Sequence, residues 1–325
     1  MNRRWLTATI SAFVLVAGCG GGESSGGATS VEPTPHTPAG MQTLTTVPPP
    51  PGQDTSCGDA TASLRPDPVL PPPGQMPVGS TMEAIQKQGR LKAGVDQNSY
   101  LFGYRDPITG ELSGFDVDIA REIARAIFGD PSKIEFRPMS SAQRVDALKN
   151  KDVDVVVRTF TINCERRKDI EFSSVYYRSA QRVLVGRDSK ANGLADLGGK
   201  GVCAAKGSTS ISRIANAVPK PVPIQVEYWS DCLVLLQLGQ VEAISTDDTI
   251  LAGMAAQDPG TKVVGPSLGA EPYGIGVPKS NADMVKFVNG VLERLRSDGT
   301  WTSIYQKNLS ILGPPPVPPA SPYKD

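Results

Sequence analysis

The stretch GFDVDIAREIARAIFGDPSKIEFRPMSSAQRVDALKNKDVDVVV, residues 114–157, decides the fold class. Its first part predicts a helix whose apolar residues recur every four positions, at Phe115, Ile119, Ile123 and Ile127. A strand, a second helix and a continuous apolar strand follow, over 134–137, 142–148 and 153–157. This alternation of helix and strand indicates an α/β fold with parallel sheets covered by helices.

The alternation continues on both sides of this stretch. A strand is expected before it, over 91–95. The strands and helices expected after it cover 182–185, 201–204, 209–217, 224–228, 231–238 and 243–245. Because ligands bind beyond the carboxyl ends of the strands in such sheets, the residues that follow each strand are the candidates for a binding site.

The composition limits the chemistry of the folded part. The 325 residues carry 33 basic and 33 acidic side chains, and this neutral balance argues against nucleic acid as the main partner. The single histidine, His36, lies in a Pro-rich tail, which removes Ser-His-Asp catalysis, Cys-His catalysis and His-ligated zinc. We expect neither a cofactor nor a metal, and we expect a monomer.

The N-terminus resembles an export signal. Met1 to Arg4 is basic, and the apolar run from Trp5 to Ala17 is too short to span a membrane. The following Gly18-Cys19 completes a sequence similar to a bacterial lipobox, in which the cysteine is lipidated; an ordinary secretory signal is the alternative. We therefore expect a signal peptide over 1–18 and an extracytoplasmic lipoprotein anchored to the cell membrane through Cys19.

Two Pro-rich segments flank the folded part. Residues 19–79 predict a lipid-anchored linker, because they are rich in Gly, Ser and Pro. Residues 313–325 predict a second Pro-rich tail. Both segments are expected to be disordered.

Four cysteines remain after Cys19. An even number in an exported protein indicates two disulfides, with three possible pairings. Cys203 and Cys232 are expected in one part of the fold, which favours the pairs Cys203–Cys232 and Cys57–Cys164. Free thiols are the alternative.

The residues that follow the expected strands suit a zwitterionic ligand. They are Asp96 after the strand 91–95; Arg158, Thr159, Thr161 and the run Glu165–Lys168 after 153–157; Lys206, Ser208 and Thr209 after 201–204; and Thr246 to Asp248 after 243–245. An arginine fork binds a carboxylate, and an aspartate accepts from an ammonium group. The alternatives are that the run Glu165–Lys168 is a solvated surface and that Ser208 only caps a helix.

With these residues in place, the chain resembles the family 3 extracellular solute-binding proteins, the polar amino-acid receptors of ABC importers. Four segments carry the resemblance: Gly114–Ala120, Thr161–Ser173, Lys206–Ser210 and Thr246–Asp248. Lesser matches are Tyr273–Gly276 and Asp298–Trp301. The lipobox and the Pro-rich tether resemble those of actinobacterial glutamine/glutamate-binding lipoproteins.

The resemblance implies a two-lobed periplasmic-binding-protein fold of type II, in which two hinge strands join the lobes. Lobe 1 is expected over 80–180 and 270–312, and lobe 2 over 181–269. Ligand contacts from both lobes then favour a closed form that a membrane partner recognises.

The resemblance also implies roles for individual residues. Arg166 is expected to bind the α-carboxylate with help from Thr161 and the helix end at Ser208 and Thr209, and Asp247 is expected to bind the α-ammonium. The remaining positions expected to line the cleft are Asp96, Ser99, Ser141 and Trp229. Thr159, which follows the strand 153–157, is a further candidate for ligand binding.

The side-chain specificity of the ligand stays open between two classes. Arg144 lies where acidic-amino-acid receptors of the family place an arginine, and Arg158 or Lys206 adds positive charge, which favours glutamate or aspartate. Asp96 favours glutamine or asparagine, because it repels a carboxylate unless an arginine neutralises it. A surface position of Arg144 on its helix is the alternative.

Two other functions compete with an importer receptor. A dehydratase on the same fold needs an acid or base in the cleft, but Asp96 and Asp247 are better explained as ligand contacts, so we expect no enzyme. An amino-acid sensor that signals through a membrane partner uses the same cleft, and the sequence does not separate it from a receptor that serves an ABC-importer permease.

Overall fold

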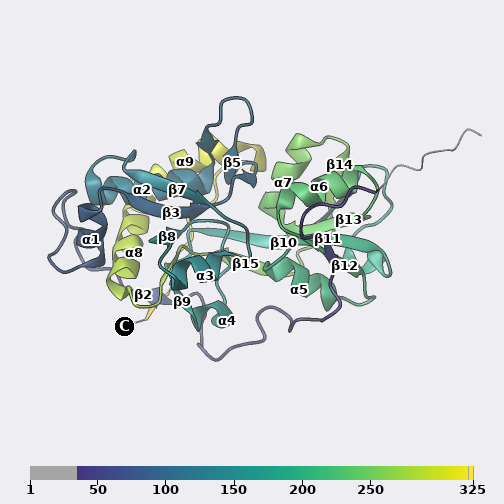
Figure 1. Cartoon of the computed structure of the whole chain (residues 1–325), viewed down its shortest axis with the longest axis horizontal. Helices are drawn as coiled ribbons and strands as arrows, with labels where there is room; N and C mark the ends of the chain where they lie inside the picture. The colour runs from purple at the N-terminus through teal and green to yellow at the C-terminus, as the bar shows by residue number, and fades with distance from the viewer. Residues whose placement is uncertain (1–34, 321, 325) are drawn as a thin grey trace, which may run out of the picture. The chain divides into compact units, whose positions relative to one another are not determined.

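The chain divides into two units, Met1–Pro35 and His36–Asp325, and the computed structural model describes residues 35–320 and 322–324. The expected signal peptide, Cys19 and the first part of the expected linker lie outside the described residues. The second unit contains two large β-sheets with helices packed on them (Figure 1). Within the described ranges, no helix has the length and apolar character needed to cross a membrane.

The first large sheet has five strands in the order β7-β3-β8-β16-β9. These strands are β3 (Leu91–Val95), β7 (Ile134–Pro138), β8 (Val155–Val156), β9 (Ile170–Phe172) and β16 (Gly276–Pro278). The helices of this part, which we call the five-stranded half, are α1 (Thr81–Lys87), α2 (Phe115–Phe128), α3 (Arg144–Lys149), α4 (Cys164–Arg167), α8 (Ala282–Ser297) and α9 (Thr300–Leu309). A short sheet precedes α2 and consists of β4 (Asn98–Ser99), β5 (Gly103–Arg105) and β6 (Leu112–Ser113).

The expected helix over 115–128 is confirmed as α2. Its four-residue apolar repeat is fully buried in the largest hydrophobic core, together with side chains of α8 and α9. The helix begins after Gly114, whose φ is 127° and where a Cβ atom would lie 2.3 Å from the carbonyl oxygen of Phe102. Only glycine tolerates both this backbone conformation and this close approach.

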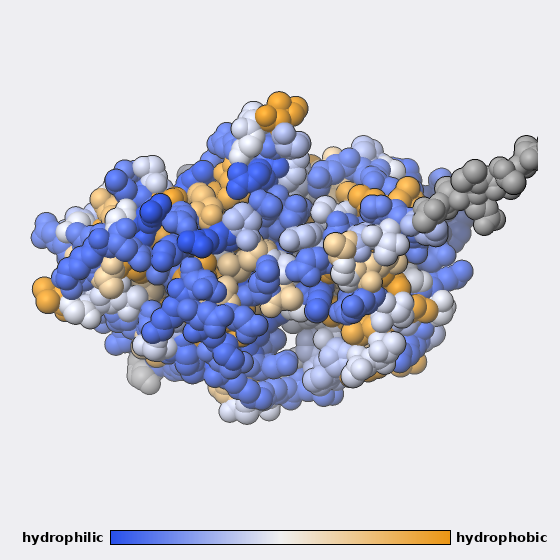
Figure 2. Space-filling model, viewed as in Figure 1, coloured by the Kyte–Doolittle hydropathy of each residue, from blue (hydrophilic) through white to orange (hydrophobic). Residues whose placement is uncertain are grey.

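The second large sheet has seven strands, β1-β12-β11-β13-β10-β14 with β15 paired to β10. These are β1 (Gln42–Thr43), β10 (Tyr177–Gly186), β11 (Gly201–Ala205), β12 (Val222–Val226), β13 (Ala243–Asp247), β14 (Thr261–Val264) and β15 (Ala270–Tyr273). The helices of this seven-stranded half are α5 (Thr209–Ala215), α6 (Trp229–Gln237) and α7 (Asp248–Gln257), and the 3-10 helices of the unit are Leu194–Leu197 and Ser310–Leu312. The visible surface is mostly hydrophilic, and its apolar side chains lie in small separate groups (Figure 2).

Two antiparallel strands, β10 and β15, connect the halves. Tyr177 of β10 and Tyr273 of β15 are register partners and belong to the core of the five-stranded half. Farther along β10, Val183 to Val185 belong to the core of the seven-stranded half. β10 therefore passes from one core into the other.

Both large sheets are mixed, whereas the sequence predicted parallel ones. β3 pairs in parallel with β7 and β8, and β11 pairs in parallel with β12 and β13, as helix-strand alternation requires. β10 and β16 lie inside the sheets and pair antiparallel with their neighbours, because the chain crosses between the halves and later returns.

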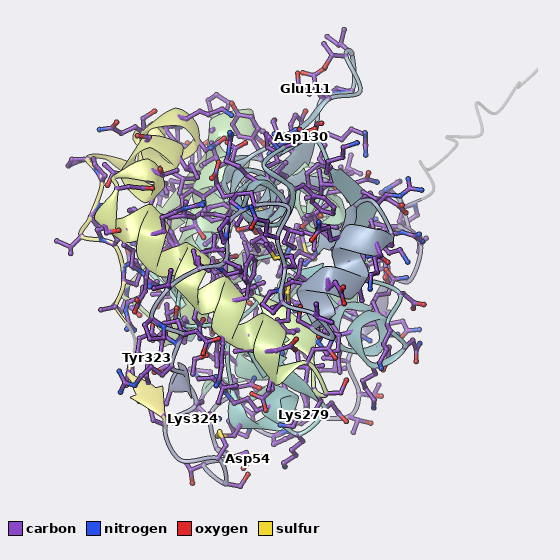
Figure 3. All side chains as sticks on the ribbon, turned by 90° about the vertical axis from the view of Figure 1, so that its left-hand side faces the viewer. Asp54, Glu111, Asp130, Lys279, Tyr323 and Lys324 are labelled. Carbon is purple, nitrogen blue, oxygen red and sulfur yellow. A yellow bond between two sulfur atoms is a disulfide. The ribbon has the colours of Figure 1, made fainter. Side chains whose placement is uncertain are left out.

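The prediction of disordered tails is wrong for the described part of both segments. β1 pairs with β12 of the seven-stranded sheet, and β2 (Ser63–Leu64) pairs in parallel with β17 (Tyr323–Lys324) near the C-terminus. Figure 3 shows Tyr323 and Lys324 at the same end of the unit as Asp54. A proline lacks the backbone N–H donor but can still lie in or beside an edge strand. Short edge strands and tertiary contacts therefore order these segments.

Both favoured disulfides are confirmed. Cys57 is bonded to Cys164 at the start of α4, across 107 residues of sequence. Cys203 of β11 is bonded to Cys232 of α6 within the seven-stranded half.

Candidate ligand-binding site

A small pocket lies where the halves meet, at the carboxyl ends of β11 and β13 and beyond β8. The space between its lining atoms is about 220 Å³. It is lined by Ser141, Arg144, Thr159, Thr161, Arg166, Ser208, Thr209, Ser210, Trp229, Thr246, Asp247 and Ile250. The polar and charged lining suits one small zwitterion.

The structure brings together eight of the eleven ligand-binding candidates from the sequence. The eight that line the pocket are Arg144, Thr159, Thr161, Arg166, Ser208, Thr209, Trp229 and Asp247, and Ser141 joins them. Asp96, Arg158 and Lys206 do not line it, and neither does Ser99. Whether the eight bind the ligand stays a prediction.

Asp96 and Arg158 form a buried ion pair behind the pocket wall. Arg158 Nη2 lies 2.9 Å from Asp96 Oδ2, and both side chains are almost fully buried. Asp96 also accepts from the backbone N–H groups of Gln97 and Asn98 and from the hydroxyl of Ser99 (2.6 Å). Arg158 therefore neutralises the carboxylate that was expected to repel an acidic ligand.

Lys206 is exposed and faces a separate surface hollow that Glu227 also lines. It follows β11 directly, but the backbone turns at Gly207 before the helix α5 begins. Gly207 has a φ of 74°, and a Cβ atom there would lie 2.6 Å from Cα of Ala142. Glycine is therefore required for the halves to approach each other at this turn.

Arg166 has a guanidinium group that is only partly used by the protein. Its Nη1 donates to the carbonyl oxygen of Thr161 (2.6 Å) and its Nη2 to that of Gly207 (3.2 Å). Of the five N–H groups of an arginine, three thus keep no bond to the described residues. The ring of Phe160 lies 4.9 Å below the guanidinium. This arrangement leaves a fork that can hold a carboxylate with two hydrogen bonds.

Arg144 is more fully bonded and deeply buried, at 3 % exposure. It donates to the carbonyl oxygens of Ser141, Arg158, Thr159 and Gly207, at 2.9 to 3.4 Å. One N–H group of Nη2 keeps no bond to the described residues. Burial, and then repulsion from Arg166 and Arg158, lowers the pKa of Arg144. The surface alternative for Arg144 is therefore excluded, and an anion in the pocket would relieve this repulsion.

Asp247 is the acidic residue of the pocket lining. It is 4 % exposed, and its Oδ2 accepts from the hydroxyl of Tyr273 (2.6 Å). Burial, and then the negative charge of Glu271, raises the pKa of Asp247 to about 8. A bound ammonium group would favour the ionised carboxylate, because the positive charge offsets the burial.

Trp229 begins helix α6 and is 2 % exposed. Its indole N–H has no hydrogen-bond partner within the described part of the chain. A buried donor without an acceptor costs about 1–3 kcal/mol, and the pocket is the polar space next to this side chain.

Sequence reasoning missed Glu271, Arg213 and Tyr273 as parts of the site. Glu271 and Tyr273 stand in β15, directly before and within a segment that was noted only as a lesser match. Arg213 points back from α5 onto Gln181 of β10 and onto Glu271. No local sequence signal marks these residues, because strand pairing and the helix direction bring them behind the residues that line the pocket.

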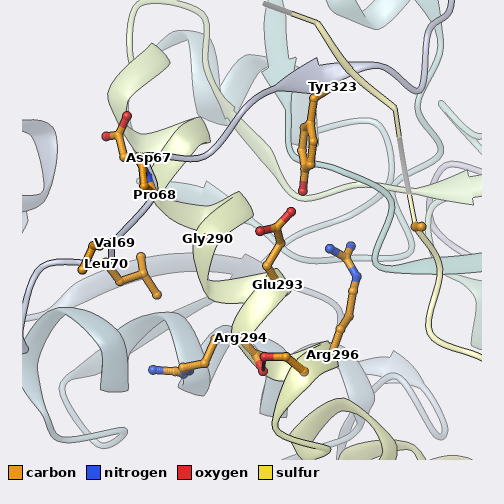
Figure 4. A pocket seen from close by; sticks show the side chains of 11 residues that line it. Asp67, Pro68, Val69, Leu70, Gly290, Glu293, Arg294, Arg296 and Tyr323 are labelled. Carbon is orange, nitrogen blue, oxygen red and sulfur yellow. Dashed lines mark hydrogen bonds between the residues drawn. The ribbon is translucent and has the colours of Figure 1, made fainter.

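A larger hollow of about 1330 Å³ lies away from this pocket, between α8 and the segments around β2 and β17. Figure 4 shows Glu293 and Arg296 of α8 with Tyr323 on its walls. None of the predicted site residues lines it, so it does not compete with the pocket between the halves as the ligand site.

Comparison with known proteins gives consistent matches. The family model described as bacterial extracellular solute-binding proteins, family 3, matches residues 91–311. The ABC transporter glutamine-binding protein GlnH of Bacillus subtilis is 38% identical over 228 residues, covering 70% of this chain and 84% of that protein. The glutamate-binding protein GluB of Corynebacterium glutamicum is 30% identical over 267 residues, covering 78% of this chain and 85% of that protein.

A solved structure supports the architecture. The crystal structure of a solute receptor for L-cysteine of Neisseria gonorrhoeae superposes with a TM-score of 0.69 at 29% sequence identity, and the match covers 72% of this chain and 96% of that one. The two sheets and the connecting strand pair are therefore the arrangement of a known amino-acid receptor.

Proposed function

The chain belongs to the bacterial extracellular solute-binding proteins of family 3, and from this premise we propose that it binds an acidic amino acid, glutamate or aspartate, in the pocket between its halves. Proteins of this family are non-catalytic, so the chain is an amino-acid-binding protein of an ABC transporter and not an enzyme. The finer question is which amino acid it binds.

The charge balance of the pocket carries the proposal. Within the described residues, the carboxylate of Asp96 is offset by Arg158 and that of Glu271 by Arg213. An α-amino acid uses one arginine for its carboxylate and one aspartate for its ammonium group. Pairing Arg166 and Asp247 in this way leaves Arg144 without an anion, and the side-chain carboxylate of glutamate or aspartate supplies one.

Glutamine and asparagine follow closely as candidates. The single open N–H group of Arg144 and the unbonded indole N–H of Trp229 can donate to an amide oxygen as well as to a carboxylate oxygen. The Bacillus relative is named as a glutamine-binding protein and the Corynebacterium relative as a glutamate-binding protein. The acidic ligand is favoured because its charge compensates a buried arginine.

Binding is proposed to close the cleft by a hinge at β10 and β15. The proposed lobes are residues 80–180 with 270–312, and residues 181–269. Ligand contacts from both lobes favour the closed form, which the membrane partner recognises. Lipid attachment at Cys19 is proposed to hold the protein at the membrane. Signalling through a membrane partner remains the alternative to delivery to a permease.

A thermal-shift panel on the purified protein with oxidised disulfides tests the ligand class. At about 100 times its Kd a ligand adds ~2.7 kcal/mol, which corresponds to a rise in Tm of roughly 5–10 °C. We expect this rise with glutamate and aspartate and a smaller one with glutamine and asparagine. A rise with the two amides alone would contradict the acidic assignment, and no rise with any of the four would contradict the proposal as a whole.

The variant Arg144→Ala tests the side-chain assignment. The Kd of glutamate should increase by about 10–100-fold, because one charged hydrogen bond is lost, whereas the Kd of glutamine should change less. Isothermal titration with both ligands gives the ratio of the two increases in Kd, for glutamate and for glutamine. This ratio does not change when the variant loses affinity for both ligands equally. Arg90→Ala, which removes an exposed arginine paired with Glu135, is the control. Equal losses for the two ligands would refute the role of Arg144.

A further inference from the structure

Glu271 is a buried carboxylate next to the pocket. Its side chain is fully buried in β15. Its Oε2 accepts from the hydroxyls of Thr161 (2.6 Å) and Thr209 (2.8 Å), and its Oε1 accepts from Nη1 of Arg213 (2.7 Å). A buried charge is tolerated only when it is paired and hydrogen-bonded, and these three bonds meet that condition.

These bonds connect the two halves of the unit. Thr161 follows β8 in the five-stranded half and forms a β-bridge with Tyr273. Thr209 and Arg213 lie in α5 of the seven-stranded half. A hinge motion that separates the halves changes the distance between these two sets of donors, so the full set of bonds requires the closed arrangement.

The direction of the bonds decides what the two threonines offer a ligand. A hydroxyl has one proton to donate and two lone pairs that accept. Thr161 and Thr209 both line the pocket and both donate their proton to Glu271. They therefore present acceptors to the ligand, which suits its ammonium group and not the carboxylate that the sequence analysis assigned to them.

We propose that Glu271 is a positioning residue of the binding site, which turns the hydroxyls of Thr161 and Thr209 toward the ligand's ammonium group and makes that arrangement depend on closure. This inference rests on the proposed function, because it concerns the α-amino end of an amino acid. That end is common to glutamate and glutamine, so the inference does not depend on which of them binds.

The charge of Glu271 also acts on Asp247. The groups that face Asp247 are Tyr273, Glu271, Asp248, Arg144 and Arg166. After burial, repulsion from Glu271 is the largest contribution that raises the pKa of Asp247, to about 8. Below that pH the empty pocket holds a protonated Asp247, so binding an ammonium group releases a proton and strengthens as pH rises from 6 to 8.

The variant Glu271→Gln separates positioning from a purely structural role. At pH 8 the Kd of glutamate and of glutamine should increase by about tenfold, because the hydroxyls lose their fixed direction. At pH 6 the loss should be smaller, because removing the charge lets Asp247 ionise at lower pH. Titration calorimetry at both pH values measures the difference. Equal losses at the two pH values, or no loss, would overturn the proposal.

A second readout needs no ligand. The carboxyl ¹³C titration of Asp247 in the empty protein should shift to lower pH in Glu271→Gln, and an unchanged titration would overturn the proposal even if neither amino acid binds. Failure of wild-type binding alone would contradict the proposed function instead. Thr209→Val removes one of the two hydroxyls that Glu271 positions and should weaken the binding of both ligands.

A second inference rests on residues 36–64, which we call the strap. At one end β1 extends the seven-stranded sheet, and the carbonyl oxygen of Pro48 accepts from Asn216 (2.8 Å) beyond α5. At the other end Cys57 is bonded to Cys164, and Asp54 pairs with Lys168 (2.5 Å). The strap is thus attached to both halves, and in Figure 1 it runs below them from β12 to α4.

The strap also lies over an open cavity next to the ligand pocket, and Pro48, Pro49 and Pro51 form part of the wall of this cavity. Arg166, Ser208 and Thr209 line both this cavity and the pocket. Figure 2 shows a small opening in the lower part of this face. We infer that the strap restrains opening of the cleft and slows release of the bound amino acid.

The double variant Cys57→Ser/Cys164→Ser tests the strap. Its dissociation rate for glutamate, followed by stopped-flow fluorescence, should increase several-fold, because one attachment is lost. Its ligand-free radius of gyration by X-ray scattering should increase as well. Cys203→Ser/Cys232→Ser removes a disulfide inside one half and should leave both quantities unchanged. No change in the first variant, or the same change in both, would overturn the inference.

Discussion

Replacing Arg166 by alanine should abolish measurable binding of every amino acid, glutamate and glutamine alike. Arg166 keeps three N–H groups without a bond to the described residues, next to a pocket of about 220 Å³. Each charged hydrogen bond contributes about 1.5–3 kcal/mol, so losing a two-bonded carboxylate should raise Kd by at least ~100-fold. Titration calorimetry at pH 8 measures both ligands.

The control for this prediction is a variant that removes a charge of the same helix outside the pocket. Lys168→Ala fits, because Lys168 is exposed and pairs with Asp54 of the strap. It should retain equilibrium binding within about threefold, since exposed pairs contribute only ~0–1 kcal/mol. Wild-type affinity in Arg166→Ala would place the ligand carboxylate on another residue.

The variant Asp247→Asn should lose amino-acid binding and gain stability when empty. An asparagine has no charge for the ammonium group, so Kd should increase by about 100-fold. The pKa of Asp247 is raised to about 8, from 3.8 for an ordinary aspartate. The empty protein therefore loses stability as pH rises between these values, and a neutral asparagine avoids that loss. At pH 8 the Tm of the variant should be higher by about 2 °C or more.

Scanning calorimetry of the ligand-free protein between pH 4 and pH 8 tests whether the Asp247→Asn variant is more stable than the wild type, as predicted. The difference in Tm between variant and wild type should shrink toward pH 4, where the wild-type carboxyl is protonated in the folded state. Asp248→Asn is the matched control, because Asp248 is the next residue and does not line the pocket. A lower Tm at pH 8 in Asp247→Asn would contradict the raised pKa.

Local sequence patterns were sufficient to predict the helices and strands that position the site. The four-residue repeat of Phe115 to Ile127 placed α2, and the alternation of strands and polar residues placed Arg166 after β8 and Asp247 at the carboxyl end of β13. Both signals are local, since one amphipathic face or one strand end is encoded by residues close together in sequence. The same logic gave the disulfide Cys203–Cys232 within one half.

The sequence overstated the disorder of the Pro-rich segments. The composition of these segments predicts that they bury little apolar surface and are therefore disordered. This holds for a segment that makes no contacts with the rest of the chain. In this protein the strap gains partners far away in sequence: strand β12, Asn216 and the disulfide to Cys164. No feature within residues 36–64 specifies those contacts.

What the sequence by itself determined was the alternating fold, the family resemblance and the residue types of an amino-acid site. Only the tertiary structure decided which charges face the pocket. It paired Asp96 with Arg158 behind the wall, turned Lys206 outward, and placed Glu271 against Thr161 and Thr209. The physical reason is that the charge an amino acid meets depends on its neighbours within a few ångströms, and strand register and the packing of the two halves choose those neighbours.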